Sequence, residues 1–264
     1  MKKVYLGINV SHGASATLMI DNTIVAAVQE ERFNKIKNFC GYPKKSIEFC
    51  LKYVRKKKLL IDKAAFSTIN NPIFPYKYPI EHFYTIADWF DHYGEKFYSK
   101  KIGKRSIESY LIKLSKDSRN NTDLYLPYDT VKSKDYFNNY SLFRDMQEKY
   151  ILKQSKGLIK KISFIDHHTC HAHYAYFSSK LKEKKCAVIT LDSEGDGINQ
   201  TVWIYDEKTN SLKKVIESDE CDLARIYRFI TLILKMKPNL HEYKVMGLAP
   251  YAKKSYTMEV YKDV

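Results

Sequence analysis

The N-terminal segment consists of short apolar runs separated by polar turns. The runs are Val4–Val10, Ala16–Ile20 and Thr23–Val28, and the polar pair Asp21-Asn22 separates the last two. Short apolar runs joined by such turns are typical of hairpin-connected strands. This segment is therefore predicted to form a three-strand meander.

Helical and strand patterns alternate after the meander. Apolar residues recur at helical spacing after Pro43, which suits a first helical turn, and a strand is predicted at Ala64–Ile69. Ile162–Ile165 is a second predicted strand, and a helical run follows it through Ser178. The intervening segment, 80–160, is rich in Tyr, Lys and Asp and has mostly helical or irregular patterning, which favours an inserted helical segment.

The pattern of the first meander returns late in the chain. Cys186–Leu191, Gln200–Tyr205 and Leu212–Ile216 are apolar runs separated by turns. In each copy the first run ends on a small polar side chain, Asn9 or Asp192, and a glycine-containing turn follows. The sequence therefore contains an internal echo at long range.

Such turns expose backbone N–H groups beside a carboxylate or an amide, a geometry suited to phosphate or metal-bound phosphate. Candidate cofactor-binding residues of this kind are Asn9 and Gly13 in the first copy and Gly195 and Gly197 in the second. One hairpin alone would be weak evidence, but two copies indicate a duplicated unit.

By fold analogy, this duplication indicates an α/β chain with the ribonuclease-H-like duplicated fold of the actin and sugar-kinase superfamily, whose nucleotide lies between the copies. We expect a first subdomain at 1–180, with a helical insertion at about 70–160. The start of a second subdomain is expected at 181–264, with the second copy incomplete.

Four of the chain's eight histidines lie between positions 167 and 173. On a helix, His167 and His171 share a face, a spacing that lets two imidazoles reach one cation. The strand predicted after this helix ends at Asp192, which would supply a third ligand. Two histidines and one carboxylate with open positions suit iron(II), with zinc and manganese as competitors.

Structural histidines are the alternative explanation of this cluster, and for His168 and His173 taken singly the structural interpretation is favoured. His12 lies in the first glycine turn. Its ring either faces the cleft expected between the two copies or caps the turn.

Length and composition bound the class of protein. The chain has 264 residues, of which 44% are hydrophobic and 28% charged, and only 9 are Gly and 7 Pro, which excludes collagen-like and wholly disordered chains. Its five cysteines contain no Cys-x-x-Cys pair, so reduced thiols are expected. No apolar stretch is long enough to span a bilayer and no signal peptide is recognisable, so the cytoplasm is the expected location and no membrane partner is expected.

The net charge of +15 is unevenly distributed. Residues 33–160 carry 26 basic and 13 acidic side chains, which accounts for +13 of the excess. Solvated helix faces are the favoured interpretation, and a rim that attracts anions is the alternative. The excess charge avoids the chemical motifs and no RNA-binding motif is recognisable, so a nucleic-acid partner is not expected.

Five groups of short motifs cover the chain except for the 70–160 insertion. They are Gly7–His12 with Ala14–Ala16, Ile24–Phe33, His167–Ala172, Thr190–Asp192 and Lys244–Tyr251. In this order and spread they resemble the NodU/CmcH family of O-carbamoyltransferases.

The resemblance implies an amino-terminal domain similar to the metal-bearing transferase subunit that makes threonylcarbamoyl-adenosine in tRNA. In such enzymes, a YrdC-like domain converts ATP and carbamoyl phosphate to carbamoyl-adenylate, and the first domain passes the carbamoyl group to a substrate hydroxyl. His167, His171 and Asp192 match the metal ligands, and His12 matches an active-site histidine. Lys244, in the last motif, is a candidate cofactor-binding residue on the same ground.

The sequence departs from the family pattern at several positions. Ser193 replaces a glycine that usually follows the aspartate, and His241 stands where an acidic or small residue is common, so Glu242 becomes the candidate acceptor-side base. The chain stops shortly after Tyr251. We therefore expect a fragment, a split gene product or a decayed copy that lacks a later aspartate ligand and the YrdC-like domain.

Two functions remain open on these grounds. The first is a carbamoyltransferase module that acts on a hydroxylated sugar or natural-product acceptor, with a separate chain carrying the YrdC-like domain as its partner. The alternative is a nucleotide- or metal-binding subunit without turnover.

Overall fold

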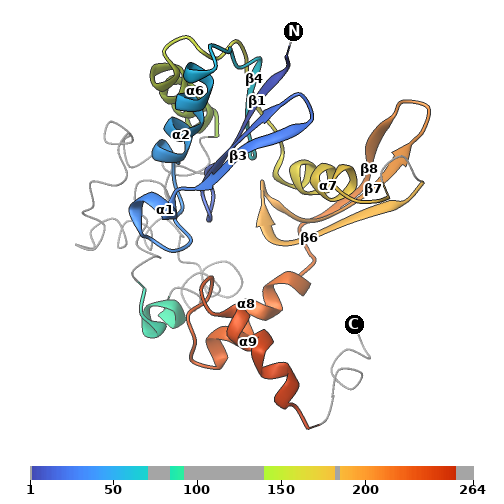
Figure 1. Cartoon of the computed structure of the whole chain (residues 1–264). Helices are drawn as coiled ribbons and strands as arrows, with labels where there is room; N and C mark the ends of the chain where they lie inside the picture. The colour runs from blue at the N-terminus through green and yellow to red at the C-terminus, as the bar shows by residue number, and fades with distance from the viewer. Residues whose placement is uncertain (1, 71–83, 92–139, 182–184, 254–264) are drawn as a thin grey trace.

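The computed structural model describes residues 2–70, 84–91, 140–181 and 185–253. This part of the chain is a mixed α/β structure with a five-stranded sheet and a three-stranded sheet (Figure 1). The helical insertion expected at about 70–160 lies mostly outside the described residues. Within it, the structure describes a short helix at 86–91 and α6 (Tyr140–Ser155).

The five-stranded sheet has the strand order β3-β2-β1-β4-β5. Its antiparallel half is the predicted meander, formed by β1 (Val4–Asn9), β2 (Ser15–Ile20) and β3 (Thr23–Gln29). Its parallel half adds β4 (Lys63–Phe66) and β5 (Ile162–Phe164) next to β1. The strands predicted from the apolar runs are thus confirmed, and β4 is three residues shorter than expected at its end.

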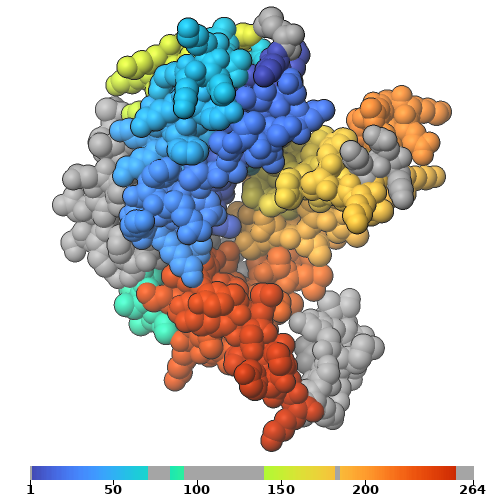
Figure 2. All heavy atoms as spheres, viewed as in Figure 1, coloured from blue at the N-terminus to red at the C-terminus, as the bar shows by residue number. Residues whose placement is uncertain are grey.

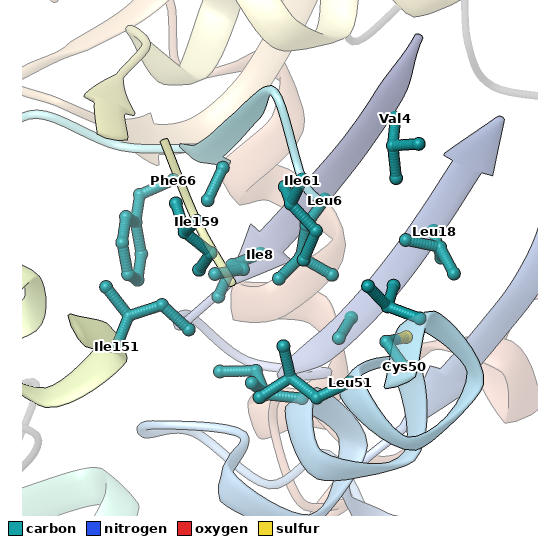
Figure 3. Close-up of a cluster of buried hydrophobic side chains, with 14 of the residues drawn as sticks. Val4, Leu6, Ile8, Leu18, Cys50, Leu51, Ile61, Phe66, Ile151 and Ile159 are labelled. Atoms are coloured by element: carbon teal, nitrogen blue, oxygen red, sulfur yellow. The ribbon is translucent and has the colours of Figure 1, made fainter. Parts of the chain in front are cut away.

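The main core lies between this sheet and two helices, α2 (Lys44–Lys56) and α6. Strand alternation turns the same face of β1 toward the helices, and the side chains it buries there pack against apolar residues of α2 and α6 (Figure 3). Truncating one of these side chains, such as Leu51, to alanine would cost about 2–5 kcal/mol.

Glu30 fixes the start of α2. Its buried carboxylate accepts hydrogen bonds from the backbone N–H of Lys45 (3.0 Å) and of Ser46 (2.7 Å) and from the Ser46 hydroxyl (2.8 Å). These N–H groups have no partner within the helix, and a negative charge at a helix N-terminus is favourable. Pro43 precedes the helix rather than occupying its first turn, because the helix begins at Lys44.

The three-stranded sheet is the second meander that the sequence predicted. It consists of β6 (Ala187–Gly195), β7 (Ile198–Asp206) and β8 (Ser211–Ser218), paired antiparallel in chain order. Helix α7 (His167–Phe177) covers one face, where Ala172 and Tyr176 pack against the sheet. The opposite face exposes four large apolar side chains, those of Ile189, Leu191, Ile204 and Ile216.

The turn after Asp192 is shorter than the sequence predicted. Strand β6 continues to Gly195, although its ladder with β7 is irregular between Leu191 and Gly195. The turn itself contains Asp196 and Gly197, both with positive φ. In the irregular stretch the backbone stays extended, but Asp192 is outside the regular strand pairing. The pattern of apolar residues in the sequence does not predict this irregularity.

The last described elements are α8 (Leu223–Ile233), α9 (Glu242–Leu248) and the 3-10 turn η5 (Ala249–Tyr251), which confirms the predicted helix end at the proline turn. Figure 2 shows α8 and α9 as a lobe below the two sheets. The described helices include none that is long and apolar enough to cross a membrane. None of the five cysteines, all of which lie among the described residues, forms a disulfide bond.

Candidate metal centre

Helix α7 carries the histidine cluster, and its start is fixed by Asp166. The Asp166 carboxylate accepts hydrogen bonds from the backbone N–H (2.8 Å) and the hydroxyl (2.9 Å) of Thr169, a typical N-cap. The helix therefore begins at His167, and His167 and His171 stand one turn apart on the same face.

Asp192 completes the predicted triad. The Nε2 atom of His167 lies 2.7 Å from Oδ2 of Asp192 and 3.0 Å from Nε2 of His171, and the last pair, His171 Nε2 and Asp192 Oδ2, is 3.6 Å apart. The structure thus brings together the three residues that the sequence proposed as metal ligands.

The geometry of this triad fits a divalent metal ion. Ligand atoms bound at about 2.0–2.2 Å to one ion lie about 3 Å from one another, close to the three separations in the structure. The Nε2 atom of a histidine carries one proton or one lone pair, so it makes one directed hydrogen bond. Here Nε2 of His167 faces both Asp192 and His171, a convergence that a shared cation would satisfy.

Within the triad, His167 and Asp192 shift each other's pKa. Burial lowers the pKa of His167, but the hydrogen bond and negative charge of Asp192 outweigh burial, so the net pKa is above its ordinary value of 6.5. Burial raises the pKa of Asp192, but hydrogen bonds from His167, His171 and the Ser193 N–H hold it well below its usual range. Asp192 is therefore a carboxylate at any physiological pH.

The absence of a side chain at Gly195 leaves room for the ring of His167. A Cβ atom built on Gly195 would lie 2.1 Å from Cδ2 and 2.5 Å from Cγ of His167, far inside any real contact. The imidazole ring therefore lies directly against the Gly195 backbone. The structure places Gly195 beneath the ring of His167, and contact between its N–H group and a cofactor stays a prediction.

Asp196 connects this helix to the first sheet. Its carboxylate accepts hydrogen bonds from the backbone N–H groups of His167 (2.7 Å), Ile69 (3.0 Å) and Asn70 (2.8 Å), and also from the Thr68 hydroxyl. One side chain thus holds the end of the segment after β4 and the first residue of α7. Its effect is to fix His167, the first residue of the triad, next to the end of β4.

His168 belongs to the core and not to the triad. It is fully buried, its Nδ1 atom lies 2.7 Å from the Thr190 hydroxyl, and its Nε2 atom lies 3.1 Å from the Ile198 carbonyl. The Trp203 indole N–H donates to Thr201 (2.7 Å), whose hydroxyl is 2.5 Å from that of Thr190.

The indole N–H can only donate and the Ile198 carbonyl can only accept, so every hydrogen bond in this row is donated in the direction from Trp203 to Ile198. His168 therefore carries its proton on Nε2. Burial lowers the pKa of His168 and keeps it neutral. His173 packs its ring against Phe177 and Trp203. Both residues fit the structural interpretation favoured from the sequence.

The turn between β1 and β2 presents His12. The Asn9 side-chain amide donates to the carbonyls of His12 (3.2 Å) and Gly13 (3.3 Å), and Gly13 has a φ of 67° that favours glycine. An isolated bridge pairs His12 with Cys40. Asn9 and Gly13, predicted to contact a cofactor, thus build the turn that holds His12.

His12 lines an open pocket of about 340 Å³ beside the triad. Burial lowers the pKa of His12; the charge of Asp192 opposes this, while Arg228 and the triad histidines lower the pKa further. The net result is a neutral imidazole at pH 7. The pocket is lined by His12, Asn38, Asp192, Ser193, Ala224, Tyr227, Arg228, Asn239 and Glu242.

This lining unites three of the residues predicted from the sequence, His12, Asp192 and Glu242. Glu242 also accepts a hydrogen bond from the Asn239 N–H (2.6 Å) at the start of α9. Lys244 is exposed on α9 above the ring of Tyr243 and is not part of the described lining.

Sequence reasoning missed several residues of this region. Asn38 donates from its side chain to the Asn239 carbonyl and so joins the segment after β3 to the α8–α9 connection. Arg228 faces the pocket from α8. In the sequence, Arg228 is marked only by lying one helical turn from Ala224, and Asp196 only as a second carboxylate four residues after Asp192.

Comparison with known proteins gives the family. The family described as Carbamoyltransferase N-terminus matches residues 4–263, so the chain belongs to this family. It is 28% identical over 258 residues to the uncharacterized protein sll1178 of Synechocystis, a match that covers 93% of this chain and 34% of that protein.

Two further relatives come from other organisms. The nodulation protein NolNO of Sinorhizobium fredii is 26% identical over 244 residues, covering 91% of this chain and 28% of that protein. The uncharacterized protein MJ1058 of Methanocaldococcus jannaschii is 31% identical over 130 residues, which is 44% of this chain and 21% of that protein. The chain thus spans about a third or less of the length of these relatives.

Proposed function

We propose that this chain is the metal-binding module of an O-carbamoyltransferase, which passes a carbamoyl group from carbamoyl-adenylate to a hydroxyl of a sugar or natural-product acceptor. Family membership supports the class of reaction. The observation that carries the proposal is the pocket itself, because His12 and the triad residue Asp192 line the same space. A base and a metal ligand therefore face one bound substrate.

His12 is the proposed general base. The acceptor hydroxyl oxygen forms a bond to the carbamoyl carbon, the bond from that carbon to the phosphate oxygen breaks, and AMP leaves. The proton of the hydroxyl passes to His12, whose lowered pKa keeps it neutral and able to accept a proton at pH 7. Glu242, the first residue of α9, also lines the pocket and is the second candidate to accept this proton.

His167, His171 and Asp192 are the proposed ligands of a divalent ion, with iron(II) favoured and zinc or manganese as alternatives. Such an ion would supply Lewis acidity toward a donor oxygen in the pocket. Asp196 and Gly195 position the first ligand. His12, which is not a member of the triad, remains free for proton transfer.

We further infer that the two meanders are copies of one ribonuclease-H-like unit, as in the actin and sugar-kinase superfamily. Support comes from the identical antiparallel order of β1-β2-β3 and β6-β7-β8 and from the parallel strands that follow β1 in the first sheet. On this basis the first subdomain spans 1–180 and the second begins at 181.

Catalysis on this proposal requires polypeptide equivalent to the rest of the longer relatives. Two of those relatives match nearly all of this chain with only 34% and 28% of their own length. The exposed side chains of Ile189 and Ile216 lie in one register row across the three-stranded sheet, with Val202 between them. A bare apolar row of this kind is suited to packing against further chain, and a YrdC-like domain would provide the adenylate.

The test is carbamoyl transfer by this chain together with the polypeptide that supplies the remaining part of its relatives. Labelled carbamoyl phosphate and ATP are the substrates, and label in the acceptor and AMP release are measured. His12→Asn is expected to lower the rate about 100-fold or more, with metal content and melting temperature unchanged. His241→Asn, the same change at a histidine outside the described pocket lining, is the control. A His12→Asn protein with the wild-type rate would remove His12 from the mechanism.

The second candidate function is a nucleotide- or metal-binding subunit without turnover. The His167–His171–Asp192 triad and the pocket beside it are all that this function requires. On this alternative the protein binds metal or AMP, but no partner restores transfer.

A further inference from the structure

The two arginines of α8 both bind Ser193, the residue next to the triad member Asp192. Arg225 donates from Nε to the Ser193 carbonyl (2.8 Å), and Arg228 donates from Nη2 to the Ser193 hydroxyl (3.0 Å). The Ser193 N–H in turn donates to Asp192 (2.6 Å). The pocket wall formed by α8 is thus attached directly to the metal centre.

The two arginines differ in how their charge is balanced. Arg225 pairs with Asp222 (2.8 Å) and lies 3.8 Å from Glu194. Arg228 has no carboxylate within 4.0 Å among the residues that the structure describes. A guanidinium has five N–H donors, and the bond to Ser193 is the one side-chain hydrogen bond of Arg228 within that part of the chain.

Arg228, with donors left over, is one of the residues that line the pocket. Arg228 is half-buried and lines the same space as His12 and Asp192. Its charge is among the causes, after burial, that hold the pKa of His12 down, in keeping with their closeness. An uncompensated, half-buried guanidinium beside a metal-ligand set is suited to oxyanions, which it binds with charge-assisted hydrogen bonds.

We propose that Arg228, held by Ser193, is the anion-binding residue of this pocket, and that the pocket takes a substrate whose phosphate or carboxylate group reaches Arg228 beside the triad. The binding of an anion does not depend on the transfer reaction. The identity of the substrate rests on the proposed function, because the anion is either the phosphate of carbamoyl-adenylate or an acidic group on the acceptor.

The hydroxyl of Ser193 is the group that holds Arg228, and a glycine at this position would have no hydroxyl to accept that hydrogen bond. Ser193→Gly is therefore expected to weaken anion binding severalfold by releasing the guanidinium. Ser193→Thr keeps the hydroxyl and is expected to retain most of the affinity. If only the backbone at this position mattered, retention of the hydroxyl would make no difference.

Calorimetric titration of the full chain, with and without added zinc, tests the proposal. The probes are inorganic phosphate, AMP, glucose 6-phosphate and adenosine, the last as the neutral control. Arg228→Gln is expected to weaken binding of phosphate about tenfold or more, and Arg228→Lys less. Arg32→Gln removes the same charge from an exposed side chain outside the described lining and is the matched control. Melting temperature and zinc content verify that each variant folds.

The probes distinguish the two sources of the anion. A loss for AMP and phosphate, with adenosine binding unchanged, assigns the subsite to the nucleotide. A loss for glucose 6-phosphate and phosphate, with AMP unchanged, assigns it to the acceptor. The proposal is overturned if wild-type protein binds no phosphate at about 10 mM, or if Arg228→Gln loses no more affinity than Arg32→Gln. Absence of metal or of transfer with anion binding intact would instead count against the proposed function alone.

Discussion

The ring of His167 lies directly against the backbone of Gly195, with no room for a side chain between them. Gly195→Ala is therefore expected to push the imidazole away from Asp192 and to lower metal affinity about 10- to 100-fold, the usual effect of disturbing groups that orient a ligand. Titration with cobalt(II), followed by its visible absorption, measures both the affinity and the coordination geometry.

The control for this change is Gly247→Ala. Gly247 lies in α9, and a Cβ atom there would meet nothing within 4 Å. We expect unchanged cobalt binding. Wild-type affinity in Gly195→Ala would show that the ring has another position from which to bind.

Asp196 gives a second prediction, because its carboxylate holds both His167 and the segment after β4. Asp196→Asn replaces one acceptor oxygen by a donor, so the free energy of unfolding should fall by about 1.5–3 kcal/mol and metal affinity should fall with it. Urea denaturation and cobalt titration measure the two effects. Asp206→Asn, at a turn where the carboxylate accepts one exposed hydrogen bond, should change neither.

The buried row of hydrogen bonds from Trp203 to Ile198 gives a third prediction. Thr201→Val has nearly the same shape but leaves the Trp203 N–H without its acceptor and Thr190 without its donor. The expected cost is about 1–3 kcal/mol of unfolding free energy, measured by urea denaturation. Thr209→Val, in an exposed turn, is the control, and an equal loss there would indicate that the buried row contributes nothing.

The parts of this molecule that sequence predicts are those with local causes. The apolar runs of β1 and β2 are a few residues apart, so their pairing follows from alternation and a short turn. The shared face of His167 and His171 follows from helical periodicity. For these, the pattern of letters contains the necessary information.

The parts that the sequence does not predict depend on contacts between residues that are far apart in the chain. The contact between Thr68 and Asp196 joins residues 128 positions apart, and Asn38 meets Asn239 across 201 positions. Gly195 in a polar turn suggests phosphate binding, and only the packing of α7 on β6 reveals its role beneath an imidazole. A role that is set by what a residue faces is invisible until the chain is folded.

Metal affinity should depend on pH. Asp192 raises the pKa of His167 above 6.5 in the metal-free protein, so at pH 6 most His167 side chains carry a proton that metal must displace. As pH rises through that raised pKa, the proton is lost and apparent affinity increases, by about tenfold per unit where one proton is displaced. It then becomes constant. Cobalt titrations between pH 6 and 8 measure this, and equal affinities throughout would contradict it.

The central claim is that His167, His171 and Asp192 bind one divalent ion. Elemental analysis of protein purified without chelators, before and after addition of iron(II), tests it in wild type, His171→Ala and the control Tyr174→Ala, an exposed position on the same helix. We predict close to one metal per chain in wild type and Tyr174→Ala, and its loss in His171→Ala. Less than about 0.1 metal per wild-type chain, or full metal in His171→Ala, would contradict the account.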